Sequence, residues 1–112
     1  MAINAEREGD TLVAKAEGRI DGTNAREFQD DLDSVIEEGD RTVILNFEDL
    51  MYISSAGIRV VLMTAKTLQR REARFALCSL SEPVREIFEV SGFDKIIPIH
   101  ASQADAISAL GG

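Results

Sequence analysis

Two adjacent serines lie between an apolar stretch and a helical pattern, within the sequence YISSAGIR at residues 52–59. A serine hydroxyl can cap a helix, attack a substrate or accept a modification such as a phosphate group. Ser54 and Ser55 are followed by Ala56 and Gly57, which add almost no side-chain bulk. The segment therefore predicts a small, polar and accessible spot on the protein surface.

Helix capping explains only part of this pattern. The hydroxyl of Ser54 or Ser55 can accept a hydrogen bond from a backbone N–H in the first turn of a helix that begins at Ala56. Capping does not explain Gly57, because glycine near a helix start lowers the stability of the helix. We interpret the small residues as room for the close approach of a partner's backbone or of another enzyme's active site.

Catalysis by these serines is not supported elsewhere in the sequence. A serine nucleophile needs a general base, and the only histidine, His100, lies one or more predicted strands away. The G-x-S-x-G motif and the glycine-rich nucleotide motifs are absent. No second His or Cys stands at ligand spacing, and no Asp/Asn cluster matches a calcium loop. We expect no catalytic residue, no metal and no cofactor.

Composition and charge limit the classes of partner. The chain has 112 residues, the size of one domain, and a net charge of −8. Binding to nucleic acid or to an anionic membrane surface relies on clustered Lys and Arg, so neither partner is expected. Acids and bases concentrate in two segments, which we interpret as solvated faces of helices. The acidic residues are Glu27, Asp30, Asp31, Asp33, Glu37, Glu38 and Asp40, and the basic residues are Arg59, Lys66, Arg70, Arg71 and Arg74.

The cellular location follows from what the sequence lacks. The start MAINAEREGD has neither the basic residues nor the apolar stretch of a signal peptide. No apolar run approaches the 18 residues needed to cross a bilayer. The single cysteine, Cys78, lies in the apolar run RFALCSL and is expected in the core. We therefore expect a cytoplasmic protein with no membrane insertion.

The first half of the chain predicts a hairpin, a helix and a buried strand. Alternating residues 3–8 and 12–17 flank a Gly9-Asp10 turn, and both strands are half polar, as at a sheet edge or over one covered face. A helix follows, with Asn24 and Glu27 as a capping box and Gly39 at its end. The consecutive apolar residues 43–45 predict a strand that is buried on both faces.

The second half predicts three further strand–helix units, counting the strand at 43–45 with the helix after the serines. That helix begins at Ala56. Residues 75–80 form a strand, and Ser81 caps a helix that ends at Gly92. Residues 96–99 form a last strand, which Pro98 confines to an edge, before a short helix capped by Ser102.

This order predicts one α/β domain with a mostly parallel central sheet, an N-terminal hairpin and about four helices. Right-handed crossovers place the first turns of the helices near the carboxyl ends of the strands. Ser54 and Ser55 lie at such a junction, which is where open α/β sheets usually carry their function.

The sequences GRID at 18–21 and LNFEDLMYISSAGIRVVL at 45–62, with the order of elements around them, resemble one known family. This family is the STAS-domain anti-sigma factor antagonists of bacteria. The most specific part of the likeness is the succession of strand, loop, serine, small residue, glycine and helix, where the family commonly shows Asp-Ser-Ser-Gly or Ser-Ser-Ala-Gly. The resemblance implies a single STAS-like domain over residues 1–112.

The resemblance also implies a function. In that family an anti-sigma factor that is also a serine kinase phosphorylates one serine at this helix start. The unphosphorylated antagonist binds the kinase and frees a sigma factor, and a serine phosphatase resets the cycle. We therefore expect a binding protein rather than an enzyme, with the kinase and the phosphatase as partners, existing as a monomer or weak dimer.

Carried onto this sequence, the phosphoacceptor is Ser55, with Ser54 as the alternative. Ser54 stands where the family often has Asp, and Asn46 stands where Asp is frequent at the end of the preceding strand. Asp21 matches an acidic position beside the acceptor. The expected partner-binding residues are Asp21, Ser54, Ser55, Ala56, Gly57, Ile58, Arg59 and Met63.

Two alternatives stay open. Met63 is an apolar residue on the otherwise basic stripe of Arg59, Lys66 and Arg70, so either a partner covers it or it packs against a neighbouring helix. The protein as a whole could instead be an unmodified STAS subunit of a membrane transporter or a lipid-trafficking complex. The presence of a serine at the acceptor position favours the phosphorylation switch.

Overall fold

The computed structural model of the chain describes residues 3–110, in which strands and helices follow the predicted order. The elements are β1 (Ile3–Glu8), β2 (Thr11–Ile20), α1 (Ala25–Val35), β3 (Thr42–Ile53), α2 (Ser55–Arg70), β4 (Arg74–Cys78), α3 (Glu82–Val90), a 3₁₀ turn (Phe93–Lys95), β5 (Ile99–His100) and α4 (Gln103–Ala109). Together they form one α/β domain.

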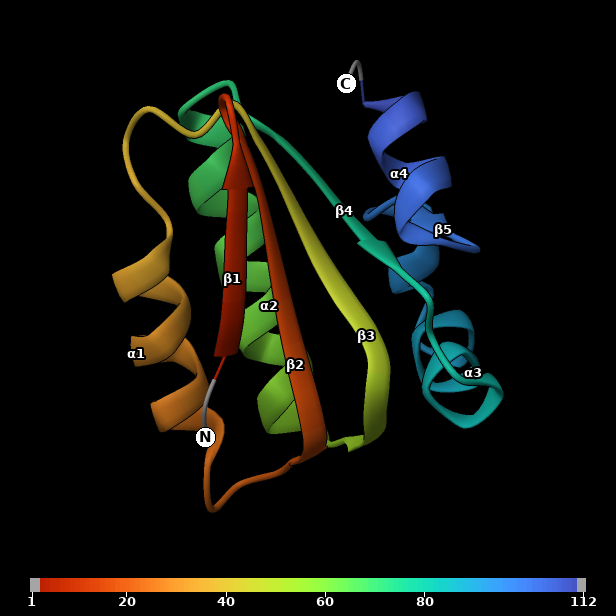
Figure 1. Cartoon of the computed structure of the whole chain (residues 1–112). Coiled ribbons are helices and arrows are strands. Elements are labelled where there is room, and N and C mark those ends of the chain that lie inside the picture. Colours follow the sequence, from red (N-terminus) through yellow and green to blue (C-terminus); the bar gives the residue numbers. More distant parts are fainter. Residues whose placement is uncertain (1–2, 111–112) are drawn as a thin grey trace.

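The five strands form one sheet in the order β1-β2-β3-β4-β5 (Figure 1). β1 pairs with β2 antiparallel as a hairpin, and all the other neighbours are parallel. This confirms the predicted fold class, including the mostly parallel sheet and the four α-helices.

Helices cover the two faces of the sheet unequally. On one face α1 contacts β1 and β2, while α2 contacts β3 and β4. On the other face α4 contacts β3, β4 and β5, so within residues 3–110 no helix lies over the hairpin half of that face (Figure 1). Alternate residues of β3 therefore enter different cores: Val43 and Leu45 join the main one, and Ile44 joins a smaller one with Cys78 and Ala106. Cys78 is buried as predicted, and burial raises the pKa of its thiol.

β3 is longer than the sequence indicates. It spans 12 residues and reaches Ile53, immediately before the serines. In its second half the buried residues Phe47, Leu50 and Ile53 are three apart instead of alternating. The pairing with β2 shifts register twice along this stretch, and such bulges hide the period of two by which strands are recognised.

The predicted ends of α1 and β5 are wrong. α1 ends at Val35, four residues before Gly39, because Ile36 is already extended. The Asn24 side chain does not cap α1; its Oδ1 accepts from the Asp21 N–H at 2.9 Å instead. Phe93–Lys95 form a 3₁₀ turn, and the Ile97 N–H just after it donates to the Phe93 carbonyl at 2.9 Å, so only Ile99–His100 remain as the edge strand.

An ion pair fastens the hairpin to the loop after α1. Asp40 is only 3% exposed, and its two carboxylate oxygens accept from Arg7 Nε at 2.7 Å and Nη2 at 2.9 Å. Arg7 Nη2 also donates to the Val35 carbonyl at 2.8 Å, and Asp40 Oδ2 accepts from the Glu37 N–H at 2.8 Å. These hydrogen bonds satisfy groups at the end of α1, and the hydrogen bond from Arg7 holds the pKa of Asp40 below its usual range.

Replacing Asp40 with Asn should lower the free energy of unfolding at pH 7 by about 1–3 kcal/mol, because Arg7 loses its charged partner. The folded-state pKa of Asp40 is depressed, so its contribution is present above the ordinary carboxyl pKa and is lost as the pH falls through the folded-state value. The stability difference between the natural protein and Asp40→Asn should therefore shrink in acid. Urea denaturation at several pH values measures it.

Asp30→Asn is the matched control, because Asp30 is an exposed aspartate on α1. This variant should leave the free energy of unfolding at pH 7 within about 0.5 kcal/mol of the natural value. A difference for Asp40→Asn that stays constant from neutral to acidic pH would contradict the assignment.

Candidate functional site

The two serines lie where β2 and β3 end side by side. Ile20 and Ile53 are the last paired residues of these strands. The Ser54 N–H then donates to the Ile20 carbonyl at 2.8 Å, and α2 begins at Ser55. The predicted position at the carboxyl end of a strand is therefore correct, and the end of β2 forms the second wall of the site.

The two hydroxyls have different surroundings. Ser54 is the N-cap of α2, with extended backbone, and its Oγ accepts from the Gly57 N–H at 3.4 Å. Ser55 is exposed in the first turn, and its hydroxyl makes no hydrogen bond with another described residue. One serine therefore satisfies the helix start, and the other presents a free hydroxyl to solvent.

Gly57 is required by packing inside the domain. A Cβ at this position would lie 2.6 Å from Ile20 Cγ2 and 2.7 Å from Ile53 Cγ1. Both isoleucines are fully buried and β-branched, so neither can move aside cheaply. The interpretation that Gly57 leaves room for an approaching partner is wrong, because the glycine lets α2 sit directly on the ends of two strands.

Asp21 lies beside the serines because it follows Ile20, whose carbonyl binds Ser54. Its Oδ1 accepts from Thr23 Oγ1 at 2.6 Å and from the Thr23 N–H at 2.9 Å. The hydrogen bonds from Thr23 lower the pKa of Asp21, so the group is ionised at neutral pH. The Asp21 carbonyl also accepts from the Ala25 N–H at the start of α1 at 2.9 Å, which anchors this loop.

The other predicted partner-binding residues divide by exposure. Ile58 is buried and Ala56 is half-buried, so both pack within the domain. Arg59 is exposed on α2, one turn beyond Ser55. Met63 is 48% exposed and lines a groove between α1 and α2 together with Ile36. The helix-packing alternative for Met63 therefore describes part of its surroundings, while half of the side chain remains open to solvent.

Sequence reasoning missed an aromatic and basic pair next to the serines. The Arg19 guanidinium lies over the Tyr52 ring at 4.5 Å from its centroid, because the two residues are paired between β2 and β3. Met51, the preceding residue, is 74% exposed. The signal was present as large side chains just before the serines, but the sequence did not indicate which of them the bulged strand turns outward.

Two other kinds of site are absent from residues 3–110. This part of the chain has no group of three or more His, Cys, Asp or Glu side chains that could hold a metal ion. None of its helices is both long enough and apolar enough to span a bilayer.

Comparisons with known proteins agree on one family. The STAS domain model matches residues 2–106. A Bordetella bronchiseptica protein, BtrV, which is provisionally named an anti-sigma factor antagonist, is 38% identical over 97% of this chain and 94% of its own length. A Thermotoga maritima structure, provisionally titled in the same way, superposes with a TM-score of 0.90 at 20% identity, covering 96% of this chain and 93% of that one.

A further solved protein, SpoIIAA, is similar to this chain in two states. Its unphosphorylated form, titled an anti-sigma factor antagonist, is 27% identical with a TM-score of 0.79, covering 96% of this chain and 95% of that one. Its phosphorylated form, from Bacillus, is 26% identical with a TM-score of 0.72, covering 96% of this chain and 98% of that one.

Ser54→Ala should lower the free energy of unfolding by about 1 kcal/mol, because the Gly57 N–H loses its acceptor at the start of α2. Ser55→Ala removes the same hydroxyl from the next residue, where it caps nothing, and should change stability by less than about 0.5 kcal/mol. Thermal or urea unfolding of the two variants compares the hydroxyls directly. Equal losses would show that Ser54 is not the effective cap.

Gly57→Ala should also destabilise the protein, by about 1–2 kcal/mol, since the overpacking against Ile20 and Ile53 exceeds the gain in helix propensity. Thr67→Ala on the exposed side of α2 is the control, and it should be neutral or slightly stabilising. A Gly57→Ala variant that is more stable than the natural protein would refute the close contact.

Proposed function

Because the chain belongs to the STAS family, we propose that it is an anti-sigma factor antagonist, which binds an anti-sigma factor and thereby releases a sigma factor. The observation that carries this proposal is Ser55: an exposed hydroxyl in the first turn of α2, unused by the domain itself, beside the ionised Asp21. The protein acts by binding and carries out no chemistry of its own. It works in the cytoplasm as a monomer or weak dimer.

Phosphorylation of Ser55 by the anti-sigma factor, acting as a serine kinase, is the switch in this proposal, and a serine phosphatase reverses it. The phosphate adds about 1.5 to 2 negative charges at pH 7. Within the domain the charge is tolerated, because it lies at the N-terminal end of α2, where the helix dipole favours an anion. The fold therefore survives the modification.

In the docked complex the same phosphate is unfavourable. An ion buried in an interface without a designed partner costs several kcal/mol. Changing a complex from almost fully formed to almost fully dissociated takes about 5.5 kcal/mol. Asp21, which directly follows the residue whose carbonyl binds Ser54, adds a second negative charge to the same surface. One phosphate therefore operates the switch without reshaping the domain.

The surface that meets the kinase follows from the exposed residues of the site. Ser55, Arg59 and Met63 provide a hydroxyl, a cation and an apolar side chain along one side of α2, and Asp21 provides an anion at its start. Ser54, Ala56, Gly57 and Ile58 contribute chiefly by setting the position of the helix start.

Ser55→Asp should weaken binding to the anti-sigma kinase while leaving the free energy of unfolding within about 1 kcal/mol, because an acid in the first turn of a helix is tolerated. Ser55→Ala should fold, bind and resist phosphorylation. Calorimetry with the purified kinase measures binding, and intact-mass analysis after incubation with ATP, followed by site mapping, locates the phosphate.

Ser108→Asp is the matched control, since it adds the same charge at an exposed position on α4, away from the site. It should bind like the natural protein. A phosphate mapped to Ser54 would reverse the assignment of the acceptor. No phosphorylation, together with kinase binding that is indifferent to Ser55→Asp, would favour the unmodified subunit of a transporter or lipid-trafficking complex.

A further inference from the structure

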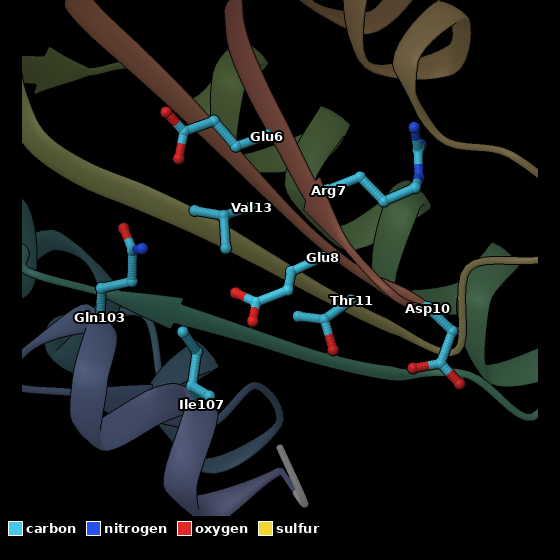
Figure 2. Close-up of a pocket in the computed structure, with 8 residues that line it drawn as sticks. All are labelled: Glu6, Arg7, Glu8, Asp10, Thr11, Val13, Gln103 and Ile107. Carbon is cyan, nitrogen blue, oxygen red and sulfur yellow. The ribbon is translucent and has the colours of Figure 1, made fainter.

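The hairpin half of one sheet face is bare, and a groove runs along it. On this face α4 covers only β3, β4 and β5. Between α4 and the hairpin lies a cavity of about 430 Å³, lined by Glu6, Arg7, Glu8, Asp10, Thr11, Val13, Gln103 and Ile107. Figure 2 shows Glu6, Glu8 and Val13 of the hairpin on one side and Gln103 and Ile107 of α4 on the other.

The groove has an apolar floor. Val13 and Ile107 are half-buried, and they pack on the small core formed by Ile44, Cys78 and Ala106. The wall on the α4 side is held in place by the buried Asn46, whose Nδ2 donates to Gln103 Oε1 at 2.9 Å. The floor and this wall therefore belong to the packed part of the domain, and they offer a preformed surface.

The rim of the groove is acidic, and no cation within residues 3–110 pairs with Glu6 or Glu8. Glu6 lies opposite Val13 in the β1–β2 pairing, and Glu8 lies opposite Thr11, so the two carboxylates flank the apolar floor. Neither makes an ion pair or hydrogen bond with another residue of the described part of the chain, 3–110. Glu6 and Glu8 are two residues apart on one face of β1, so their carboxylates repel each other. A cation placed between them is attracted by both carboxylates and relieves this repulsion.

Two basic side chains of the hairpin, Arg7 and Lys15, are already engaged. Arg7 points away from the floor in Figure 2 and pairs with the carboxylate of Asp40 at 2.7 Å. Lys15 lies two residues after Val13, on the same face of β2. Its Nζ pairs with the carboxylates of Glu48 at 3.1 Å and Asp49 at 3.3 Å. Arg7 and Lys15 therefore leave Glu6 and Glu8 unpaired, and a cationic partner can supply the matching charge.

We propose that this groove binds a cationic amphipathic segment of another protein. An apolar side chain of the segment lies on Val13 and Ile107, and Lys or Arg side chains pair with Glu6 and Glu8. A repeated pattern of apolar and basic residues satisfies both features, whereas an acidic or uniformly polar segment satisfies neither.

This surface is separate from the serines. The groove lies at the end of β2 that carries Thr11, whereas Ser54 binds the opposite end at Ile20. Those ends are about 30 Å apart, at roughly 3.3 Å per residue of strand. A segment in the groove and a partner on α2 can therefore be bound at the same time, and the inference does not depend on the phosphorylation switch.

The test uses the full chain, labelled for NMR, and a synthetic peptide with leucines on one helical face and arginines on the other. Resonances of Glu6, Glu8, Val13 and Ile107 should shift on titration. Glu6→Gln with Glu8→Gln should weaken binding roughly threefold to thirtyfold, the range expected for the loss of two exposed charge pairs. Added salt should weaken it as well.

The control variant removes the same two charges elsewhere: Asp30→Asn with Glu38→Gln, both exposed acids in the segment from 25 to 40. It should bind the peptide within twofold of the natural protein, about 0.4 kcal/mol. Equal weakening by the control, or shifts centred on α1, would mean that the peptide only follows net charge, and would overturn the proposal.

Two other peptides test the charge and the order of apolar and basic residues. A peptide with Glu in place of Arg should not bind, and one with the same composition in scrambled order should bind more weakly. Equal binding of the scrambled peptide, or no binding of any peptide, would also overturn the proposal. So would self-association of the chain through the groove, lost in Glu6→Gln with Glu8→Gln, since the occupant would then be a second copy.

Discussion

The direct contact of Gly57 with Ile20 and Ile53 fixes the point on which the rest of the site depends. Without a Cβ at this position, α2 starts in van der Waals contact with the ends of two parallel strands. The hydrogen bond from Ser54 to the Ile20 carbonyl completes the joint. The direction of α2 across the sheet, the exposure of Ser55 and the closeness of Asp21 all follow from it. Gly57, the smallest residue of the motif, is therefore the one that the packing of α2 on the two strands requires.

A surface built in this way is already organised before a partner arrives. The carboxylate of Asp21 is held by two hydrogen bonds from Thr23, and the start of α2 is capped by Ser54. Binding to such a surface orders few side chains, which keeps the entropic cost of association low. In the proposed switch, a change of charge on Ser55 would alter the electrostatics of docking and leave the backbone as it is. This separation between fold and charge suits a protein whose state must change without unfolding.

Periodicity was enough to predict the elements and their order, because most core positions recur at helical or strand spacing. It failed where tertiary contacts override the local pattern. The bulges in β3 spaced its buried residues three apart, and the hydrogen bond from Arg7 to Val35 accompanied the early end of α1. Ser55 could be singled out from the motif, whereas the stack of Arg19 on Tyr52 depends on strand register, which no local signal specifies. The structural reason for Gly57 could not be predicted either, because the residues that it contacts, Ile20 and Ile53, come from two different strands.

Every strand of the sheet lies beside its neighbour in the chain, so no strand has to be inserted between two that are already paired. The residues of the serine site, from Arg19 to Met63, are synthesised before β4, β5 and α4. The groove on the other face also needs Gln103 and Ile107 of α4, which follow all five strands in the chain. Pairing between chain neighbours also keeps the loops that must close during folding short, which favours rapid folding. The growing chain therefore contains every residue of the serine site before it contains the helix that walls the acidic groove.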